Sequence, residues 1–118
     1  MDIDSIRRHC LSFPDTRENL QWGETLCFKV GKKIFAMVSL DVASETRLTF
    51  KCSPEGFAEL LEHEGVRPAP YVGRYQWIAL ESLDALPDRQ IGDLIQRSYE
   101  IIARKTKRVG RSPQRRRK

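Results

Sequence analysis

The sequence lacks the patterns that most catalytic and metal-binding proteins carry. Its three cysteines, Cys10, Cys27 and Cys52, form no C-x-x-C pair, so we expect packed, reduced thiols and neither a disulfide framework nor a zinc site. No G-x-S-x-G, H-E-x-x-H or glycine-rich phosphate loop occurs. The two histidines, His9 and His63, fall in separate predicted helices and make no metal cluster. We therefore expect no enzymatic activity and no cofactor.

A long apolar segment is missing as well. No run approaches the roughly 20 residues needed to cross a bilayer. The opening MDIDSIRRHC places acids where a signal peptide has basic residues, and it contains no continuous apolar stretch. We therefore expect a cytoplasmic protein without a membrane partner. A chain of 118 residues fits one domain with one modest core, and we expect a monomer.

Acidic residues are absent from the last part of the chain, and this absence is informative. Residues 104–118 hold nine Lys and Arg and no acid, whereas residues 1–103 hold twelve Lys and Arg and sixteen Asp and Glu. The end of the chain is too poor in apolar residues to offset its conformational entropy by burial. We predict a domain over residues 1–105 and a disordered basic tail over residues 106–118.

A cationic tail attracts polyanions, because each Lys or Arg that neutralises a phosphate releases a condensed counterion. This gain requires no particular base sequence, so it points to nucleic acid without naming a target. The alternative is a solubilising chain end that has no partner.

Hydrophobic periodicity and turn signals predict eight elements along the chain. A polar connector separates the first helix from the first strand, and Gly73-Arg74 is expected to form a turn between the last two strands. The predicted elements are a helix from Asp2 or Asp4 to Phe13, strands 25–30, 33–40 and 47–52, a helix from Ser53 to Gly65, a short edge strand 69–72, a strand 76–81 and a helix after Pro87.

Consecutive strands joined by short turns run antiparallel, and helices with one apolar stripe bury it against a sheet. We therefore predict an α+β two-layer sandwich, α-β(3)-α-β(2)-α, with one antiparallel sheet and the helices packed on one face. Strand alternation then directs Cys27, Lys29, Arg47, Lys51 and Trp77 to the open face. Lysine and arginine hold phosphates, and an indole stacks on an exposed base. A solvated strand face with a half-buried tryptophan is the alternative interpretation.

Several segments resemble the MmcQ/YjbR-like family of small bacterial proteins, and the resemblance runs from Met1 to about Lys105. Its most specific parts are the join Lys51-Cys52-Ser53-Pro54 and the strand at Trp77, which Tyr71 and Gly73 precede. The resemblance implies an α-β(3)-α-β(2)-α sandwich and a DNA-binding role of the double-wing type. The arginine-rich C-terminus is not part of the pattern that the family shares.

DNA binding is thus the leading hypothesis, with the tail supplying affinity and the open face supplying positioning. The predicted nucleic-acid-binding residues are Lys29, Lys32, Lys33, Arg47, Lys51, Arg74, Trp77, Arg108, Arg111, Arg115, Arg116 and Arg117. A peptide-binding module of secretion-chaperone-like architecture, without enzymatic activity, is the alternative. An enzyme or small-molecule binder with a pocket near Trp22, Tyr71 and Trp77 is the third.

Overall fold

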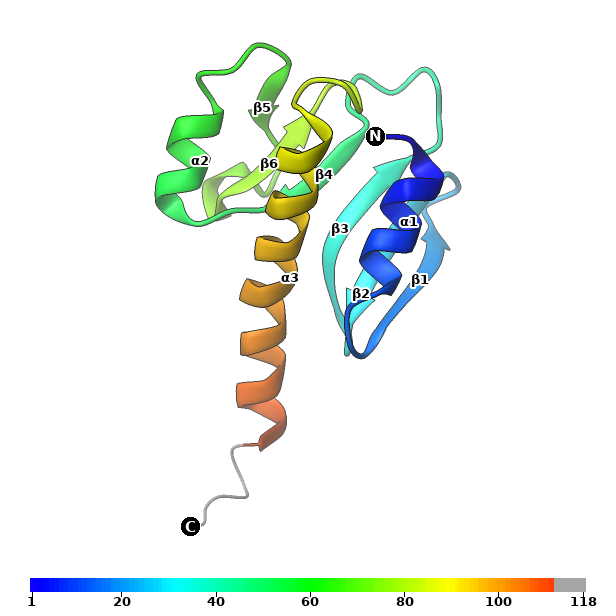
Figure 1. Ribbon diagram of the computed structural model, residues 1–118, viewed down its shortest axis with the longest axis vertical. Coiled ribbons are helices and arrows are strands. Elements are labelled where there is room, and N and C mark those ends of the chain that lie inside the picture. The colour runs from blue at the N-terminus through cyan, green and yellow to red at the C-terminus, as the bar shows by residue number, and fades with distance from the viewer. Residues whose placement is uncertain (112–118) are drawn as a thin grey trace.

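The computed structural model describes the backbone of residues 1–111 and the side chains of residues 1–105 (Figure 1). It contains strands that build one sheet and helices that cover it. They are α1 (Ile3–Leu11), β1 (Thr16–Gln21), β2 (Thr25–Val30), β3 (Lys33–Ser39), β4 (Leu48–Lys51), α2 (Pro54–Leu60), β5 (Val66–Pro68), the 3₁₀ helix η1 (Gly73–Tyr75), β6 (Trp77–Leu80) and α3 (Asp88–Arg111).

One six-stranded sheet organises the molecule, in the order β1-β2-β3-β4-β6-β5. Every pairing is antiparallel, which confirms the predicted α+β class and the single antiparallel sheet. A bulge between Phe28 and Lys29 shifts the register of β2 against β3. The helix α3 runs along the sheet toward the end where the β2–β3 turn lies (Figure 1).

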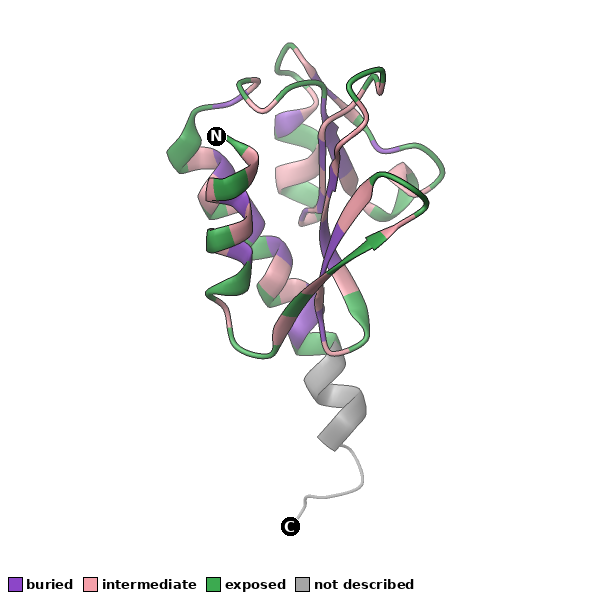
Figure 2. Ribbon diagram, turned by 90° about the vertical axis from the view of Figure 1, so that its right-hand side faces the viewer, coloured by how far each residue is buried: buried purple, intermediate pink, exposed green. Residues whose placement is uncertain are grey.

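The core lies between the sheet and the helices. Figure 2 shows the buried residues along the sheet and on the sides of α1 and α3 that face it. Phe28, Phe50 and Ile78 come from three strands of the sheet, Ile95 comes from α3, and all four are completely buried. Burying such side chains stabilises a domain by about 1.5–3 kcal/mol each. The helix α2 lies beside strands β5 and β6, at one lateral edge of the sheet, and its Leu60 joins the core.

The helix starts follow the capping rules that the sequence suggested. Asp2 accepts a hydrogen bond from the Ser5 N–H and begins α1, while Ser53 accepts one from the Gly56 N–H and begins α2 at Pro54. The predicted end of the second helix at Gly65 is wrong, because α2 stops at Leu60 and turns connect it to β5.

The buried hydroxyl of Ser98 joins α3 to two strands. It donates a hydrogen bond to the Phe35 carbonyl (2.6 Å) and accepts one from the Lys51 N–H (3.0 Å). Strands β3 and β4 are paired only from Ala36 to Val38, so these two groups lie where the ladder has ended. Ser98 therefore satisfies two backbone groups that would otherwise lack partners, and it anchors the end of β4 to the helix.

Three of the predicted elements require correction. Residues 16–21 form strand β1 instead of a polar connector, the edge strand is Val66–Pro68 instead of 69–72, and the expected turn at Gly73-Arg74 is the helix η1. Strand β1 shows no regular alternation of apolar and polar residues, because it lies at the edge of the sheet and exposes Arg17, Asn19 and Leu20. Glu18, its one carboxylate, is held by the guanidinium of Arg7 on α1, with a shortest distance of 2.6 Å.

The helix α3 extends beyond the predicted end of the domain. It continues to Arg111, so the expected boundary between residues 105 and 106 falls inside a helix. The tail beyond 111 lies outside the described residues. No helix in the described part combines the length and the hydrophobicity that crossing a bilayer requires.

Candidate nucleic-acid interface

The two ends of the sheet differ in chemistry. We call one the acidic end; it comprises the β1–β2 turn with Glu24, the loop from Asp41 to Glu45, and Glu81 after β6. We call the other the basic end, and α3 runs toward it as it continues into the tail. The basic end comprises the turn at Lys32 between β2 and β3, Lys51 at the end of β4, the loop of residues 69–77, and α3 from Arg97 onward.

At the acidic end, the arginines are bound within the protein. The guanidinium of Arg47 donates hydrogen bonds to the carbonyls of Ser39 and Asp41, both at 3.1 Å. Arg67 forms ion pairs with Glu45 at 3.2 Å and Glu81 at 2.9 Å. Arg47 therefore holds the loop between β3 and β4, and neither arginine has a guanidinium fully available for a ligand.

At the basic end, Lys51 is the central cation. Its ammonium donates a hydrogen bond to the Tyr75 carbonyl, and its backbone is tied to Ser98 on α3. Burial, together with the nearby positive charge of Lys105, lowers the pKa of the Lys51 amine below its usual value. The ammonium groups of Lys51 and Lys105 thus repel each other, and an anion placed beside them would relieve this repulsion.

A small cavity of about 200 Å³ lies next to Lys51, between the start of α2 and α3. It is lined by Lys51, Cys52, Ser53, Gly56, Leu94 and Arg97. Among the side chains of residues 1–105, no carboxylate forms an ion pair with Lys51, Arg97, Arg104 or Lys105. Two cations, Lys51 and Arg97, therefore border this cavity.

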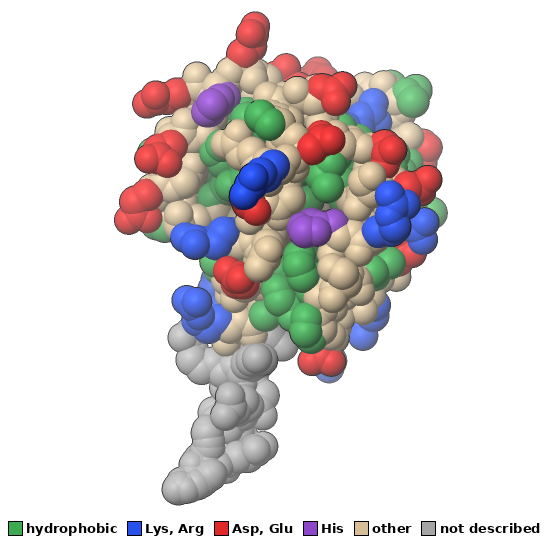
Figure 3. Space-filling view, viewed as in Figure 1, with side chains coloured by type: hydrophobic (Ala, Val, Ile, Leu, Met, Phe, Trp, Pro, Cys, Tyr) green, Lys and Arg blue, Asp and Glu red, His purple; other side chains and the backbone are tan. Residues whose placement is uncertain are grey.

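The surface charge follows the same division. On the face shown in Figure 3, most Asp and Glu lie on the upper half of the molecule, whereas Lys and Arg side chains are spread over both halves and reach its lower edge. The seven Lys and Arg of residues 106–118 follow directly after Lys105 in sequence. Lys51, Arg97, Arg104 and Lys105 therefore lie, without a carboxylate partner among the described side chains, at the end from which the basic tail continues.

The predicted site residues are divided among different environments. Lys32 and Lys33 are exposed in and beside the β2–β3 turn, and Lys29 is half-buried opposite Arg17. Trp77 is half-buried and packs against the core, which reduces its use as a stacking surface. The side chains of Arg108, Arg111, Arg115, Arg116 and Arg117 lie outside the described residues.

Two further predictions about the open sheet face are wrong. Cys27, predicted to face outward, is completely buried beneath its neighbours, with its thiol 3.5 Å from Gln21 Oε1. Arg47 is bound to backbone carbonyls, as described above. The open face therefore provides fewer free cations than strand alternation suggested.

Sequence reasoning missed Arg97 and Tyr75. Arg97 precedes Ser98, and a serine within an otherwise apolar helix stripe was a signal that α3 meets backbone groups at this point. Nothing in the residue pattern indicated that the partner would be Lys51, which is 47 positions earlier in the chain.

The thiols and carboxylates give no indication of chemistry at this site. Burial raises the pKa of the Cys52 thiol to about 11 and that of Cys10 to about 12, which keeps both in the unreactive protonated form. Within the part of the chain that the structure describes, no three His, Cys, Asp or Glu side chains are grouped closely enough to hold a metal ion.

Comparisons with known proteins place the chain among small α+β proteins. The YjbR family model matches residues 11–101. The chain is 33% identical over 104 residues to the "Uncharacterized protein YjbR" of Escherichia coli, covering 85% of this chain and 86% of that protein. A Deinococcus radiodurans crystal structure with a DUF419 domain superimposes with a TM-score of 0.76 at 25% identity, over 88% of this chain and 80% of that chain. A Pseudomonas syringae protein is similar in fold, with a TM-score of 0.69 at 19% identity, over 86% of this chain and 99% of that chain.

Proposed function

The chain belongs to the YjbR family, and we propose that it is a DNA-binding protein whose basic end and basic tail together hold the phosphate backbone. The observation that carries the proposal is the division of charge between the two ends of the sheet. The arginines of the acidic end are engaged within the protein. The cations Lys51, Arg97, Arg104 and Lys105 have no carboxylate partner among the described side chains, and they precede the tail.

The two parts have different roles in this proposal. The tail supplies affinity through counterion release, which depends on the number of phosphates neutralised and not on the base sequence. Lys51 and Arg97 border a cavity and are held by the sheet and by α3, so they fix where the backbone lies. Lys32 and Lys33 at the β2–β3 turn extend the basic end along the path of the nucleic acid.

A salt titration of binding to a labelled duplex tests the proposal on the full chain. If six to eight phosphates are engaged, the plot of log affinity against log salt has a slope of roughly −5 to −7. Replacing Arg115, Arg116 and Arg117 by glutamine removes up to three contacts, so the slope becomes less steep by as much as about 2.7.

Two single variants then separate the basic end from net charge. Arg97→Gln removes a cation of the basic end, and Arg89→Gln removes an exposed arginine from the first turns of the same helix. We expect Arg97→Gln to reduce the slope by about 0.9 and Arg89→Gln to leave it unchanged. Equal effects of the two variants would show that net charge alone acts, and absence of binding at low salt would refute the proposal.

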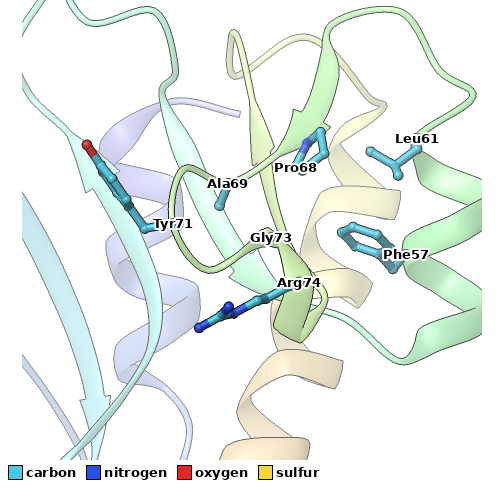
Figure 4. A pocket seen from close by; sticks show the side chains of 7 residues that line it. All are labelled: Phe57, Leu61, Pro68, Ala69, Tyr71, Gly73 and Arg74. Atoms are coloured by element: carbon cyan, nitrogen blue, oxygen red, sulfur yellow. The ribbon is translucent and has the colours of Figure 1, made fainter.

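One observation favours peptide binding as a second candidate function. A shallow, largely apolar hollow of about 470 Å³ lies between α2 and the loop of residues 69–77 (Figure 4). Phe57, Leu61 and Pro68 contribute to its walls. Peptide binding there would depend weakly on salt and would be lost in Phe57→Ser, so the same titration distinguishes the two functions.

A further inference from the structure

The loop of residues 69–77 is tightly built, although it lies at the surface. The Ala69 N–H donates to the Trp77 carbonyl at its base, and the N–H groups of Tyr75 and Gln76 donate to carbonyls inside the loop, each at 2.9 Å. A Cβ atom at Gly73 would lie 2.7 Å from the Cβ of Pro68, so only glycine fits at this position without a shift. These contacts constrain the backbone of the loop.

This conformation includes two unfavourable backbone angles. Tyr71 and Gln76 have φ values of 68° and 67°, in the left-handed region that residues with side chains rarely adopt. Such backbone strain persists where the surroundings enforce it, and it is concentrated at functional sites. The hydrogen bonds around Gly73 provide that enforcement here.

The loop displays aromatic rings to solvent. Tyr71 is 97% exposed and Tyr75 is 53% exposed, whereas Trp77 packs against the core. The guanidinium carbon of Arg74 lies 4.9 Å from the centre of the Tyr75 ring, which is a cation–π contact. Figure 4 shows that Tyr71 and Arg74 both extend away from Phe57 and Leu61.

The loop is also joined to the basic end. The ammonium of Lys51 donates to the Tyr75 carbonyl, and Lys51 lines the same cavity as Arg97. A phosphate held by Lys51 and Arg97 would thus lie close to Tyr75, and Tyr71 belongs to the same loop. Cations that hold a backbone beside rings that accept bases are the combination found in proteins that bind single strands.

We propose that Tyr71 and Tyr75 stack on unpaired bases, so that this protein binds single-stranded nucleic acid more tightly than a duplex with the same number of phosphates. This inference rests on the proposed function, because the phosphates are held by the same basic end. In a duplex, both faces of each base are covered by neighbouring bases. A surface ring can reach a base face there only after the duplex is unstacked, which costs free energy.

Fluorescence anisotropy of the full chain with labelled oligothymidylate and with a duplex of equal phosphate number tests this preference. Stacking on one base changes affinity by at least about fivefold, so Tyr75→Leu should weaken oligothymidylate binding by that factor. Duplex binding should be unchanged, and Tyr75→Phe, which keeps the ring, should retain the affinity for both ligands. Tyr71→Ser is the second variant, because removing a ring that is 97% exposed leaves the packing of the domain intact.

Trp22→Ser is the matched control. Its ring is 72% exposed and its φ is 53°, but it lies at the acidic end. We expect it to change neither affinity. The inference is overturned if the wild-type chain binds both ligands equally, if Tyr71→Ser and Tyr75→Leu leave oligothymidylate binding unchanged, or if they weaken both ligands to the same extent. If the wild-type chain showed no salt-dependent binding to either ligand, the proposed function itself would be refuted.

Discussion

The two ends of the sheet contain similar cations in different states. At the acidic end, Arg47 and Arg67 are fixed by backbone carbonyls and by carboxylates. At the basic end, Lys51 and Arg97 border a cavity, and no carboxylate within residues 1–105 pairs with them. A count of Lys and Arg does not distinguish these states. The Lys51 ammonium donates one hydrogen bond to the Tyr75 carbonyl, so it keeps further N–H donors for an anion. Only the folded structure shows whether a cation lacks a carboxylate partner and keeps such donors.

The largest change we expect concerns the contact that positions the basic end. Ser98→Ala leaves the Phe35 carbonyl and the Lys51 N–H without partners in a buried environment. Because each orphaned group costs about 1–3 kcal/mol, we expect the free energy of unfolding to fall by about 3 kcal/mol, measured by urea denaturation. Ser82→Ala is the control, since this exposed hydroxyl only bonds the Asp84 N–H in a turn of the acidic end. Equal losses in the two variants would mean that Ser98 does not anchor β4.

A smaller loss of stability is expected from Arg47→Gln at the acidic end. The variant removes charged hydrogen bonds to the carbonyls of Ser39 and Asp41, which should lower the free energy of unfolding by about 2 kcal/mol. Binding to nucleic acid should change no more than in Arg89→Gln. Arg97→Gln should show the reverse, with normal stability and weaker binding. If Arg47→Gln weakened binding as much as Arg97→Gln, the two ends would not differ in function.

Local signals in the sequence were sufficient for much of the fold. Asp2 and Ser53 begin helices because their side chains cap the first turn, and this depends only on neighbouring residues. The inward direction of Leu48, Phe50 and Ile78 follows from alternation along each strand, and all three are completely buried. The antiparallel sheet follows from short connections between consecutive strands.

The remaining features depend on contacts between distant parts of the chain. Strand β1 is polar, and its six residues are recognised as a strand only through their pairing with β2. Contacts between distant residues also decide whether a cation is free to bind an anion. Arg47 and Lys51 both follow apparent strand alternation, yet Arg47 is bound by a loop and Lys51 is placed next to α3. Residue spacing carries no signal for either arrangement.

Two substitutions that add the same charge sharpen the comparison further. Glu100→Gln removes an acid from α3 between Arg97 and Arg104, whereas Glu45→Gln removes one from the acidic end, where Arg67 retains Glu81. We expect Glu100→Gln to strengthen duplex binding roughly twofold, because one nearby repulsive charge is lost. Glu45→Gln should leave affinity unchanged and should alter stability by less than about 1 kcal/mol. Anisotropy and urea denaturation measure the two quantities, and equal gains in affinity would contradict the localisation of binding.

The smallest effect we expect is a dependence of binding on alkaline pH, through Lys51. Burial and then the charge of Lys105 lower the pKa of its amine in the folded protein, so between the folded and the unfolded pKa values the unfolded chain binds more protons. Stability therefore rises with pH in that window. Binding has the opposite sign, because a phosphate favours the charged amine and the free protein has begun to lose that charge.

Affinity for a duplex should thus begin to decline at a lower pH than for ordinary lysines. Lys51→Arg should remove this decline, since a guanidinium remains charged throughout. Lys33→Arg at the exposed β2–β3 turn is the matched control and should behave as the wild-type protein does. An identical pH profile for Lys51→Arg and the wild-type protein would show that the Lys51 ammonium does not contact the phosphate. The cavity bordered by Lys51 and Arg97 would then not be the phosphate site.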